Sequence, residues 1–366
     1  MLASKNVVIV GGGITGVATS YFLAKRGVAC TLVDPVGIAP AASGKAGGFL
    51  ALDWNDGAPV GPLARKSFSL HEELARALGE TTVDYRRLTC QSVTCTGGAQ
   101  KQAAGVEWAD LGVLGSRPMG DESTIAQVHP KKLCDALWAE AVRLAGSSLM
   151  RGRAEGVERD EQTGAVRAVQ VEGGERVAAD CVVLAMGPWS PTWFGLPQAY
   201  GTKYHSLLMR PARTLSQCVF FDCTGPTLAS LLGSLGEPEV YPRPDGTVYC
   251  TGFPDPPVVV SERPGEVEVR ADVAARLESA MRQLSSELQA APVEVQQACH
   301  LPTFADGVPV IGAVPGVPGA YVASGGGCWG ILCGPATGLA LSELILDGAA
   351  ASVDLAPFSP QRFLYT

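Results

Sequence analysis

The sequence has few charged residues, no long apolar run and no cysteine pattern typical of a metal site. Charged residues make up 17% of its 366 positions and the formal net charge is −8, which argues against nucleic acid or anionic membrane as a partner. No stretch approaches the roughly 20 apolar residues that a membrane span needs. The longest apolar run, Leu339 to Leu346, is broken by Ser342 and Glu343 and predicts a buried helix.

The eleven cysteines form no C-x-x-C pair, and the closest spacings lack the partner residues of a zinc site, so no metal is predicted. Because their number is odd and the chain is not small, free thiols in a reducing compartment are expected. A strand begins by Val7, which leaves no room for a signal peptide. A cytoplasmic location is therefore predicted, with an organelle as the alternative if a transit peptide has been removed.

Length and composition indicate a globular enzyme with two domains. A chain of 366 residues is long for a single hydrophobic core, and a hydrophobic content of 46% is typical of a well-buried protein. The 44 glycines gather in clusters, and the first cluster lies close to the N-terminus.

Residues 6–34 alternate strand, glycine turn, helix and strand. Val7-Val8-Ile9-Val10 is a continuous β-branched run, typical of a strand buried on both faces in a parallel sheet. Three glycines follow, then a predicted helix over 14–26 and a second strand over 29–33. This order predicts a Rossmann-type βαβ unit.

Gly11, Gly13 and Gly16 have the spacing of a dinucleotide-binding fingerprint. Gly11 permits the tight turn, Gly13 lets the backbone approach a pyrophosphate, and Gly16 lets the helix pack on the strand. Glycine-rich turns are common, so the pattern gains its weight from the strand before it and the helix after it.

Other groups of this unit suit the same ligand. The helix begins at Ile14 and Thr15, where unpaired N–H groups and the positive end of the helix dipole favour phosphates. Asp34 ends the second strand, where its carboxylate can accept hydrogen bonds from both ribose hydroxyls, and Pro35 follows it in the predicted site. The unit predicts a dinucleotide site without distinguishing NAD from FAD.

The later chain mixes the two kinds of sheet signal. Helices are predicted at 64–78, 130–144, 269–288 and from about 335, a β-meander at 149–183, a hairpin at 239–251, and further strands at 293–301 and 320–323. Parallel-sheet signals occur at the start, middle and end, with antiparallel signals between them. The chain is therefore expected to cross between two domains several times.

Five segments, spread over nearly the full length, carry a resemblance to a known family. In order they are Gly11 to Asp34; Ser43 to Phe49; Val128-His129-Pro130 with its helix; the strand leading to Met186-Gly187-Pro188-Trp189-Ser190; and Asp306 to Gly312 followed by Gly330-Ile331-Leu332. In these segments the chain resembles the FAD-dependent oxidoreductases of the D-amino-acid oxidase, glycine oxidase and sarcosine oxidase superfamily. It is most similar to a poorly characterised eukaryotic branch, and the resemblance implies FAD as the cofactor.

The resemblance also implies an α/β plus α+β architecture. A Rossmann-type FAD-binding domain is expected from 1–52, 127–202 and 300–366. An interleaved antiparallel-sheet substrate domain is expected from 53–126 and 203–299. The substrate would then lie between the domains, over the isoalloxazine ring.

Cofactor contacts follow from the same resemblance. The glycine-rich segment at 43–49 is expected to pass flavin N5 and O4, because small residues allow close backbone approach. A turn near the C-terminus precedes a helix predicted from about Pro335, whose first amides would stabilise the negative charge of the reduced ring at N1 and O2. The expected contacts are Ser43, Gly44, Lys45, Gly47 and Gly48 beside the flavin, Ala154 beside the adenine, Ala185 and Gly187 at the adenosine end, and Gly327, Gly330, Ile331 and Leu332 near the C-terminus.

The chain departs from the family five residues before the Asp306-Gly307 pair. The amino-acid oxidases have an arginine there that binds the substrate carboxylate, but this chain has Leu301, which weakens the expectation of simple D-amino-acid or glycine oxidation. His300 faces the other side of the strand, so a structural role is favoured unless a bulge turns it. Cys299 matches the cysteine that attaches FAD covalently in the sarcosine oxidase group. A thioether to FAD is one alternative, and a buried apolar role is the favoured one.

The tentative catalytic residues are Lys203, Tyr249 and His300. Lys203 could promote oxygen reduction near flavin C4a, or lie solvated at the start of a strand. Tyr249, like Tyr241 on the same hairpin, could orient the substrate or simply pack.

The predicted reaction is hydride removal from a carbon beside the nitrogen of a small amine or amino-acid-like substrate. Flavin N5 would accept the hydride and molecular oxygen would reoxidise the ring. One alternative is a dehydrogenase of the same fold with another electron acceptor. The other is a flavin-binding protein that has lost catalysis and serves as an interaction or trafficking partner.

Overall fold

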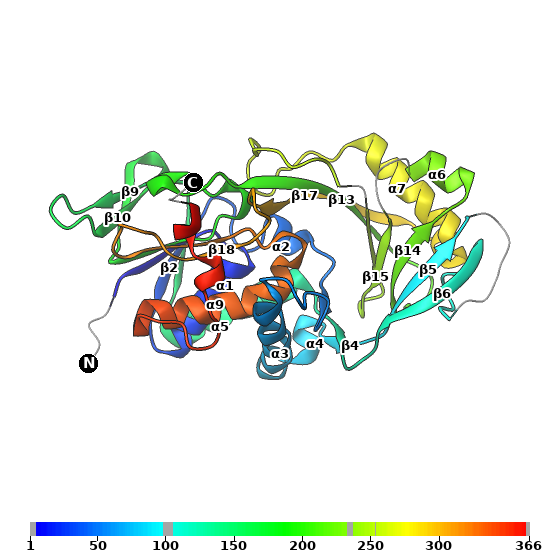
Figure 1. Cartoon of the computed structure of the whole chain (residues 1–366), viewed down its shortest axis with the longest axis horizontal. Helices are drawn as coiled ribbons and strands as arrows, with labels where there is room; N and C mark the ends of the chain where they lie inside the picture. Colours follow the sequence, from blue (N-terminus) through cyan, green and yellow to red (C-terminus); the bar gives the residue numbers. More distant parts are fainter. Residues whose placement is uncertain (1–4, 98–104, 233–236, 253, 364–366) are drawn as a thin grey trace.

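The computed structural model describes residues 5–97, 105–232, 237–252 and 254–363. Two large sheets lie one beyond the other along the long axis of the molecule (Figure 1). One sheet has six strands and the other seven, and the chain passes between them several times. The crossing that the mixed sheet signals predict is therefore present.

The six-stranded sheet has the order β18-β19-β12-β1-β2-β8, and β1 pairs in parallel with both of its neighbours. All four residues of β1 are buried, which agrees with its continuous apolar sequence. The strands are β1 (Val7–Val10), β2 (Cys30–Asp34), β8 (Ser148–Arg151), β12 (Cys181–Leu184), β18 (Val310–Ala313) and β19 (Ala320–Ser324).

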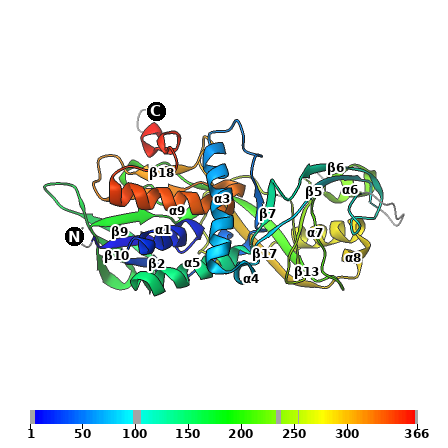
Figure 2. The same ribbon diagram turned by 90° about the horizontal axis from the view of Figure 1, so that it is seen from below.

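Helices pack against this sheet to form the largest core. Figure 2 shows α1, α5 and α9 running beside one another, with α3 crossing them. A small sheet packs on the opposite face of the six-stranded sheet and closes a second core. The elements are α1 (Ile14–Lys25), α3 (Gly61–Leu78), α4 (Glu80–Val83), α5 (Pro130–Ala145), α9 (Gly330–Asp347), and the strands β9 (Ala154–Arg159), β10 (Val166–Val171) and β11 (Glu175–Ala178).

Two features of this core differ from the sequence prediction. The last long helix begins at Gly330 and carries Pro335 inside it, whereas the prediction placed its start near that proline. The buried side chains of α3, such as Leu63 and Phe68, join the core of α1 and α9. This helix therefore lies with the six-stranded sheet, although it falls within the range 53–126 that was assigned to the other domain.

One described helical stretch, Gly327–Asp347, is long and apolar enough to cross a membrane by length and composition alone. Most of it is buried inside the protein, where α9 packs against α1 and α3. These core contacts account for its apolar sequence.

The seven-stranded sheet has the order β17-β13-β16-β15-β14-β5-β6. Its pairs are antiparallel except for β14 and β5, which run parallel. Its elements are β5 (Cys90–Cys95), β6 (Val113–Gly120), β13 (Tyr200–Met209), β14 (Cys218–Cys223), β15 (Glu239–Pro242), β16 (Val248–Gly252), β17 (Val293–Thr303), α6 (Pro226–Leu232), α7 (Ala271–Leu284) and α8 (Ser286–Gln289).

The two faces of this sheet have different surroundings. On one face, side chains such as Phe221 and Val240 form a core with α7 and α8. On the other face, Phe220, Tyr241 and Tyr249 belong to a separate aromatic cluster. That cluster includes residues of β3 (Phe49–Ala51) and β7 (Ile125–Gln127), which form a small sheet with β4 (Arg86–Arg87), so this face looks toward the first domain.

Candidate active site

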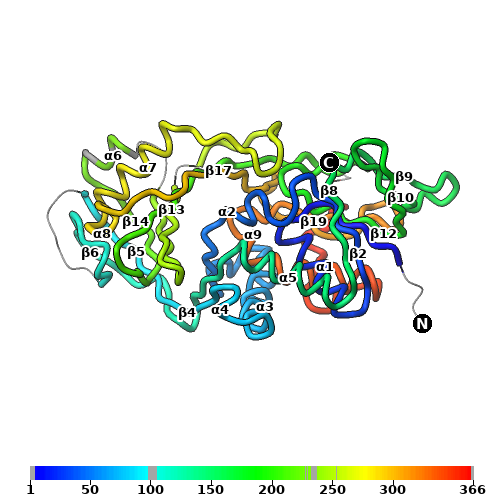
Figure 3. The backbone as a smooth tube through the Cα atoms, turned by 180° about the vertical axis from the view of Figure 1, so that it is seen from behind, coloured from blue at the N-terminus to red at the C-terminus, as the bar shows by residue number. Residues whose placement is uncertain are grey.

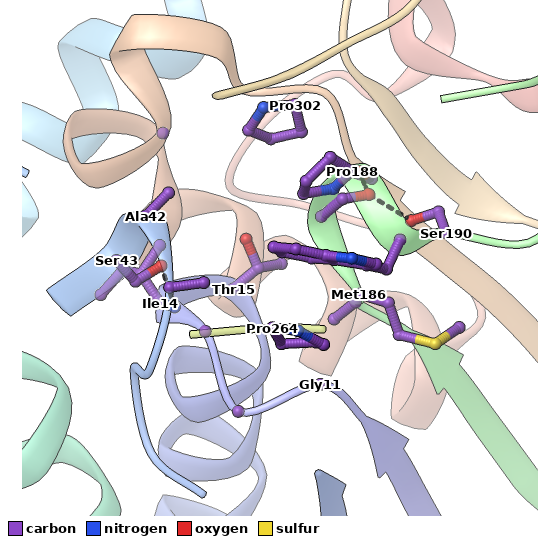
Figure 4. Close-up of a pocket in the computed structure, with 18 of the residues that line it drawn as sticks. Gly11, Ile14, Thr15, Ala42, Ser43, Met186, Pro188, Ser190, Pro264 and Pro302 are labelled. Atoms are coloured by element: carbon purple, nitrogen blue, oxygen red, sulfur yellow. Dashed lines mark hydrogen bonds between the residues drawn. The ribbon is translucent and has the colours of Figure 1, made fainter. Parts of the chain in front are cut away.

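A cavity of about 830 Å³ opens at the carboxyl ends of β1 and β12 and extends to β17 of the seven-stranded sheet. Its size is typical of a small-molecule or cofactor site. Figure 4 shows Gly11, Ile14 and Thr15 on one side of the cavity, with Met186, Pro188 and Ser190 on the other. The walls come from 10–15, 33–36, 39–43, 153–155, 185–191, 260–264 and 323–328, with single residues from other segments.

The glycine turn leaves no room for side chains at the points where the fingerprint requires glycine. Gly11 has φ +111°, and a Cβ there would lie 2.3 Å from the carbonyl oxygen of Ala185. A Cβ on Gly16 would lie 2.0 Å from the oxygen of Gly11, so Gly16 serves helix packing and does not line the cavity. Gly13 differs, because a Cβ there would meet only the Ser43 side chain, at 3.1 Å from its Oγ. The open space beside Gly13 fits a pyrophosphate that contacts the backbone.

Some N–H groups in the first turn of α1 already have a hydrogen-bond partner. The Ile14 N–H donates to Ser43 Oγ at 2.9 Å, so it is not the unpaired donor that the sequence predicted. Thr15 also lines the cavity at the positive end of the helix, where first-turn amides have no partner within the helix. Ser43 therefore contributes by fixing the start of α1 as well as by lining the cavity.

Asp34 holds two loops together at the predicted ribose position. Its Oδ2 accepts from the Gly12 N–H at 2.9 Å, and its Oδ1 accepts from the N–H groups of Val36 and Gly37 at 2.9 and 2.8 Å. A carboxylate has about four acceptor positions, so one is left for a ribose hydroxyl. Asp34 and Pro35 both line the cavity.

The glycines of the 43–49 segment are required mainly for packing, whereas the sequence prediction gave them contacts with the flavin. A Cβ would lie 2.1 Å from the Ala39 oxygen at Gly44, 2.3 Å from the Tyr241 ring at Gly47, and 1.9 Å from the Val128 oxygen at Gly48. None of these three glycines lines the cavity, whereas Ser43 and Ala46 do. Close contact with neighbouring backbone and rings accounts for the small residues.

The predicted adenosine end is assembled from three loops. Ala154, Ala185 and Gly187 all line the cavity, and the carbonyl oxygen of Gly187 accepts hydrogen bonds from two serine hydroxyls. Residues 260–264 and Glu266 also line the cavity, from a proline-rich loop between β16 and α7. This loop was not predicted from the sequence, because irregular chain carries no periodic signal.

At the C-terminal end of the cavity, Gly327, Gly330 and Ile331 line the wall, while Leu332 is fully buried behind it. Because α9 begins at Gly330, its first-turn amides lie at this wall. Pro335 has no N–H and cannot bond to the carbonyl oxygen of Ile331 four residues earlier.

His71 of α3 supplies the missing donor. Its Nε2 lies 2.9 Å from the oxygen of Ile331 and 3.2 Å from that of Leu332. One turn earlier on α3, Ser67 Oγ accepts from the Ala336 N–H at 3.0 Å. Burial lowers the pKa of His71 to about 4, so its imidazole is neutral with the proton on Nε2. These two α3 side chains complete the start of α9.

Two of the three tentative catalytic residues do not line the cavity. Lys203 and His300 are paired across β13 and β17, and strand alternation puts them on the face opposite to Cys299 and Leu301. Neither lines the cavity, and the His300 Nε2 lies 3.3 Å from Glu262 Oε2. The structure therefore gives no support to a catalytic role for either residue.

Tyr249 and Lys45 lie beside the cavity without lining it. The Tyr249 ring stacks on Tyr241 at 5.9 Å between centroids, with both rings against Gly47. Figure 3 shows α2 (Ala42–Lys45) next to β17, where Lys45 Nζ donates to the carbonyl oxygens of Ala298 and Gly265 at 3.1 and 3.2 Å. Tyr249 therefore packs in this cluster, and its role in orienting a substrate stays a prediction.

Cys299 is buried and does not line the cavity. Burial raises the pKa of its thiol to about 11, with Lys45 acting in the opposite direction. A neutral thiol is a poor nucleophile, so we predict that FAD is held without a covalent link. After acid precipitation the pellet should be colourless and the supernatant yellow. A pellet that stays yellow in the wild type and loses its colour in Cys299→Ala would contradict this prediction.

Comparison with known proteins identifies the family. Residues 6–344 match the family model described as DAO: FAD dependent oxidoreductase. A Schizosaccharomyces pombe protein named as a candidate oxidoreductase is 34% identical over 100% of both chains. Glycine oxidase of Pseudomonas putida is 27% identical over 98% of this chain and 99% of its own. The structure of glycine oxidase from Geobacillus kaustophilus matches with a TM-score of 0.79 at 23% identity, covering 98% of each chain.

The chain therefore belongs to the DAO family of FAD-dependent oxidoreductases. It is an oxidoreductase with FAD as its cofactor, and both the fold class and the family resemblance predicted from the sequence are confirmed. The open space beside Gly13 and the helix start at Thr15 fit the phosphates of this cofactor.

Proposed function

We propose that the protein oxidises a C–N bond of a small amine or amino-acid-like substrate and passes the electrons to molecular oxygen. The observation that carries the proposal is the position of the cavity, which ends at β17 beneath the inner face of the seven-stranded sheet. A substrate on that face would lie between the two domains. The names of the relatives support the class of substrate, since two of those compared above are glycine oxidases.

In this proposal Gly13, Asp34 and Gly187 would hold the dinucleotide half of FAD, and Gly327 and the start of α9 would hold its ring. When bound, FAD supplies the hydride acceptor at N5. The residues of the chain bind, orient and desolvate the substrate. Amides in the first turn of α9 would stabilise negative charge at the pyrimidine edge of the ring, because they form the positive end of an 18-residue helix.

Anaerobic reduction tests the proposed function. The holoenzyme is mixed with amines, N-substituted amino acids and D-amino acids, and the flavin absorbance is followed. At least one amine is expected to bleach the flavin. Readmitted air is then expected to restore the colour and to yield one hydrogen peroxide for each reduced flavin. Bleaching without reoxidation by air would indicate a different acceptor, and failure of every compound to bleach would contradict amine oxidation.

A further inference from the structure

A loop of the second domain forms part of the wall of the cofactor cavity. The loop runs between β16 and α7, and its residues 260–264 and Glu266 line the cavity. A bridge between Gly201 and Val258 joins the loop to β13. The domain that was predicted to hold the substrate therefore also reaches the cofactor.

The loop is held against one wall of the cavity at Glu262. The carbonyl oxygen of Glu262 accepts a hydrogen bond from the indole N–H of Trp189, which lies in the wall that follows β12. The Glu262 Oε2 atom also lies 3.3 Å from Nε2 of His300. These contacts fix Glu262 beside the wall formed by residues 185–191.

The loop is held against a second wall at Gly265. The carbonyl oxygen of Gly265 accepts from Lys45 Nζ at 3.2 Å. A Cβ on Gly265 would lie 3.3 Å from the carbonyl oxygen of Pro40, so the two backbones are in close contact. Pro40 belongs to the wall of residues 39–43, which faces the glycine turn after β1.

Residues 262–265 therefore form a strap across the cavity, with an anchor on each wall. Arg263 and Pro264 lie between the anchors, and both line the cavity. Figure 4 shows Pro264 between Met186 of one wall and Ser43 of the other. Because Ser43 contacts the glycine turn, the strap passes close to the space that fits a pyrophosphate.

The charged side chains of the cavity wall are mostly negative. Five acids and two arginines line it, and no lysine or histidine of the described ranges does so. The pyrophosphate of FAD is a dianion, so its binding within this wall needs a cation. The planar guanidinium of arginine can donate parallel hydrogen bonds to phosphate oxygens. The lining acids are Asp34, Glu155, Glu172, Glu262 and Glu266, and the lining arginines are Arg153 and Arg263.

Arg263 is better placed for the pyrophosphate than Arg153. Arg153 lies at the predicted adenine position, and its carbonyl oxygen accepts from the N–H of the lining acid Glu172 at 2.8 Å. Arg263 lies in the strap and forms no ion pair with a carboxylate of the described residues, since the adjacent Glu262 is directed toward His300. The Arg263 side chain is exposed and can turn toward the cavity.

We propose that the strap of the second domain retains FAD in the cavity, and that Arg263 binds the pyrophosphate. FAD then contacts both domains, whatever the substrate and the electron acceptor are.

Titration of the apoprotein with FAD tests the role of Arg263. Arg263→Gln is expected to weaken FAD binding by about 10- to 100-fold at low ionic strength, because charge-assisted hydrogen bonds to a phosphate are lost. Added salt should reduce this difference from the wild type, since Arg263 is exposed to solvent. Arg263→Lys keeps the charge and should recover much of the affinity, which a purely structural role of the side chain would not produce.

Arg117→Gln is the matched control for this titration. Arg117 is exposed on β6 and does not line the cavity, so the variant should bind FAD within about twofold of the wild type. FAD binding by Arg263→Gln as tight as that of the wild type would overturn the assignment of the pyrophosphate to Arg263. A larger loss of affinity in Arg153→Gln than in Arg263→Gln would overturn it as well.

The rate at which FAD leaves the holoenzyme tests the strap. Lys45→Met removes the donor to Gly265 and keeps a side chain of similar length, and Lys45 itself does not line the cavity. FAD release, followed by the rise in flavin fluorescence after dilution, is expected to be about tenfold faster than in the wild type. Lys25→Met, exposed near the end of α1, is the control and should release FAD at the wild-type rate.

An unchanged rate of FAD release in Lys45→Met would show that the anchored strap does not retain the cofactor, and would overturn this part of the proposal. Both experiments follow FAD in the absence of a substrate. Their outcome is therefore separate from that of the anaerobic reduction that tests the proposed function.

Discussion

Gly13→Val is expected to lower the affinity for FAD by about 100-fold or more, equivalent to about 2.7 kcal/mol, while the protein remains folded. Gly13 has φ −72° and ψ 179°, which valine adopts without strain. A Cβ there would meet only the Ser43 side chain, so the added methyl groups would fill the space beside the turn that fits a pyrophosphate. The ratio of flavin to protein absorbance after gel filtration, and titration of the apoprotein with FAD, measure the loss.

Gly115→Val is the matched control for this experiment. Gly115 is exposed on β6, and a Cβ there would meet nothing within 4 Å. This variant is expected to bind FAD as the wild type does. Normal FAD binding by Gly13→Val would show that the backbone of the turn does not approach the phosphates. Loss of the far-UV circular dichroism spectrum would show that the substitution acts on folding instead.

His71→Ala is expected to lower the free energy of unfolding by about 3 kcal/mol and to weaken FAD binding as well. The substitution leaves the carbonyl oxygen of Ile331 without the donor that replaces the missing N–H of Pro335. It also removes a ring that is 1% exposed, between α3 and α9. His71→Gln is the conservative variant, because its amide can donate from a similar position. Urea unfolding of the holoenzyme should show that the glutamine variant retains most of the stability that the alanine variant loses.

The stability of the wild type is expected to depend more strongly on pH than the stability of His71→Gln. The pKa of His71 is lowered from 6.5 to about 4, because protonation would bury a charge and its Nδ1 has no hydrogen-bond partner. The unfolded chain therefore binds a proton more readily, so stability is full above pH 6.5 and falls as the pH drops toward 4. Between pH 7 and pH 5 the wild type should lose about 2 kcal/mol more than His71→Gln. Parallel pH profiles for the two proteins would contradict a depressed His71 pKa.

Local chemistry explains why the cofactor half of the protein could be predicted from the sequence. The β-branched run at Val7–Val10, the glycine spacing from Gly11 to Gly16 and the acid at Asp34 act over about 30 consecutive residues. Each feature depends on backbone geometry or strand burial that neighbouring residues determine. Helices at 61–78, 130–145 and 271–284 lie within a few residues of the predicted ranges for the same reason.

The catalytic half was predicted less well, because its residues meet only in the folded chain. Lys203 and His300 had suitable chemistry, but the register of β13 with β17 places both on the outer face. The role of a residue in a sheet depends on the face to which it points and on the domain that covers that face. A pattern along the sequence contains neither kind of information.

The sequence by itself determined the βαβ unit and the glycines that admit a dinucleotide, because these follow from spacing along the chain, and its resemblance to a known family implied FAD. Only the tertiary structure decided why Gly44, Gly47 and Gly48 must be small, since their neighbours are Ala39, Tyr241 and Val128. It also decided how α9 tolerates Pro335 at the cavity wall. The donor that replaces the lost N–H comes from His71, 260 residues away in the sequence, and such contacts form only when two helices pack.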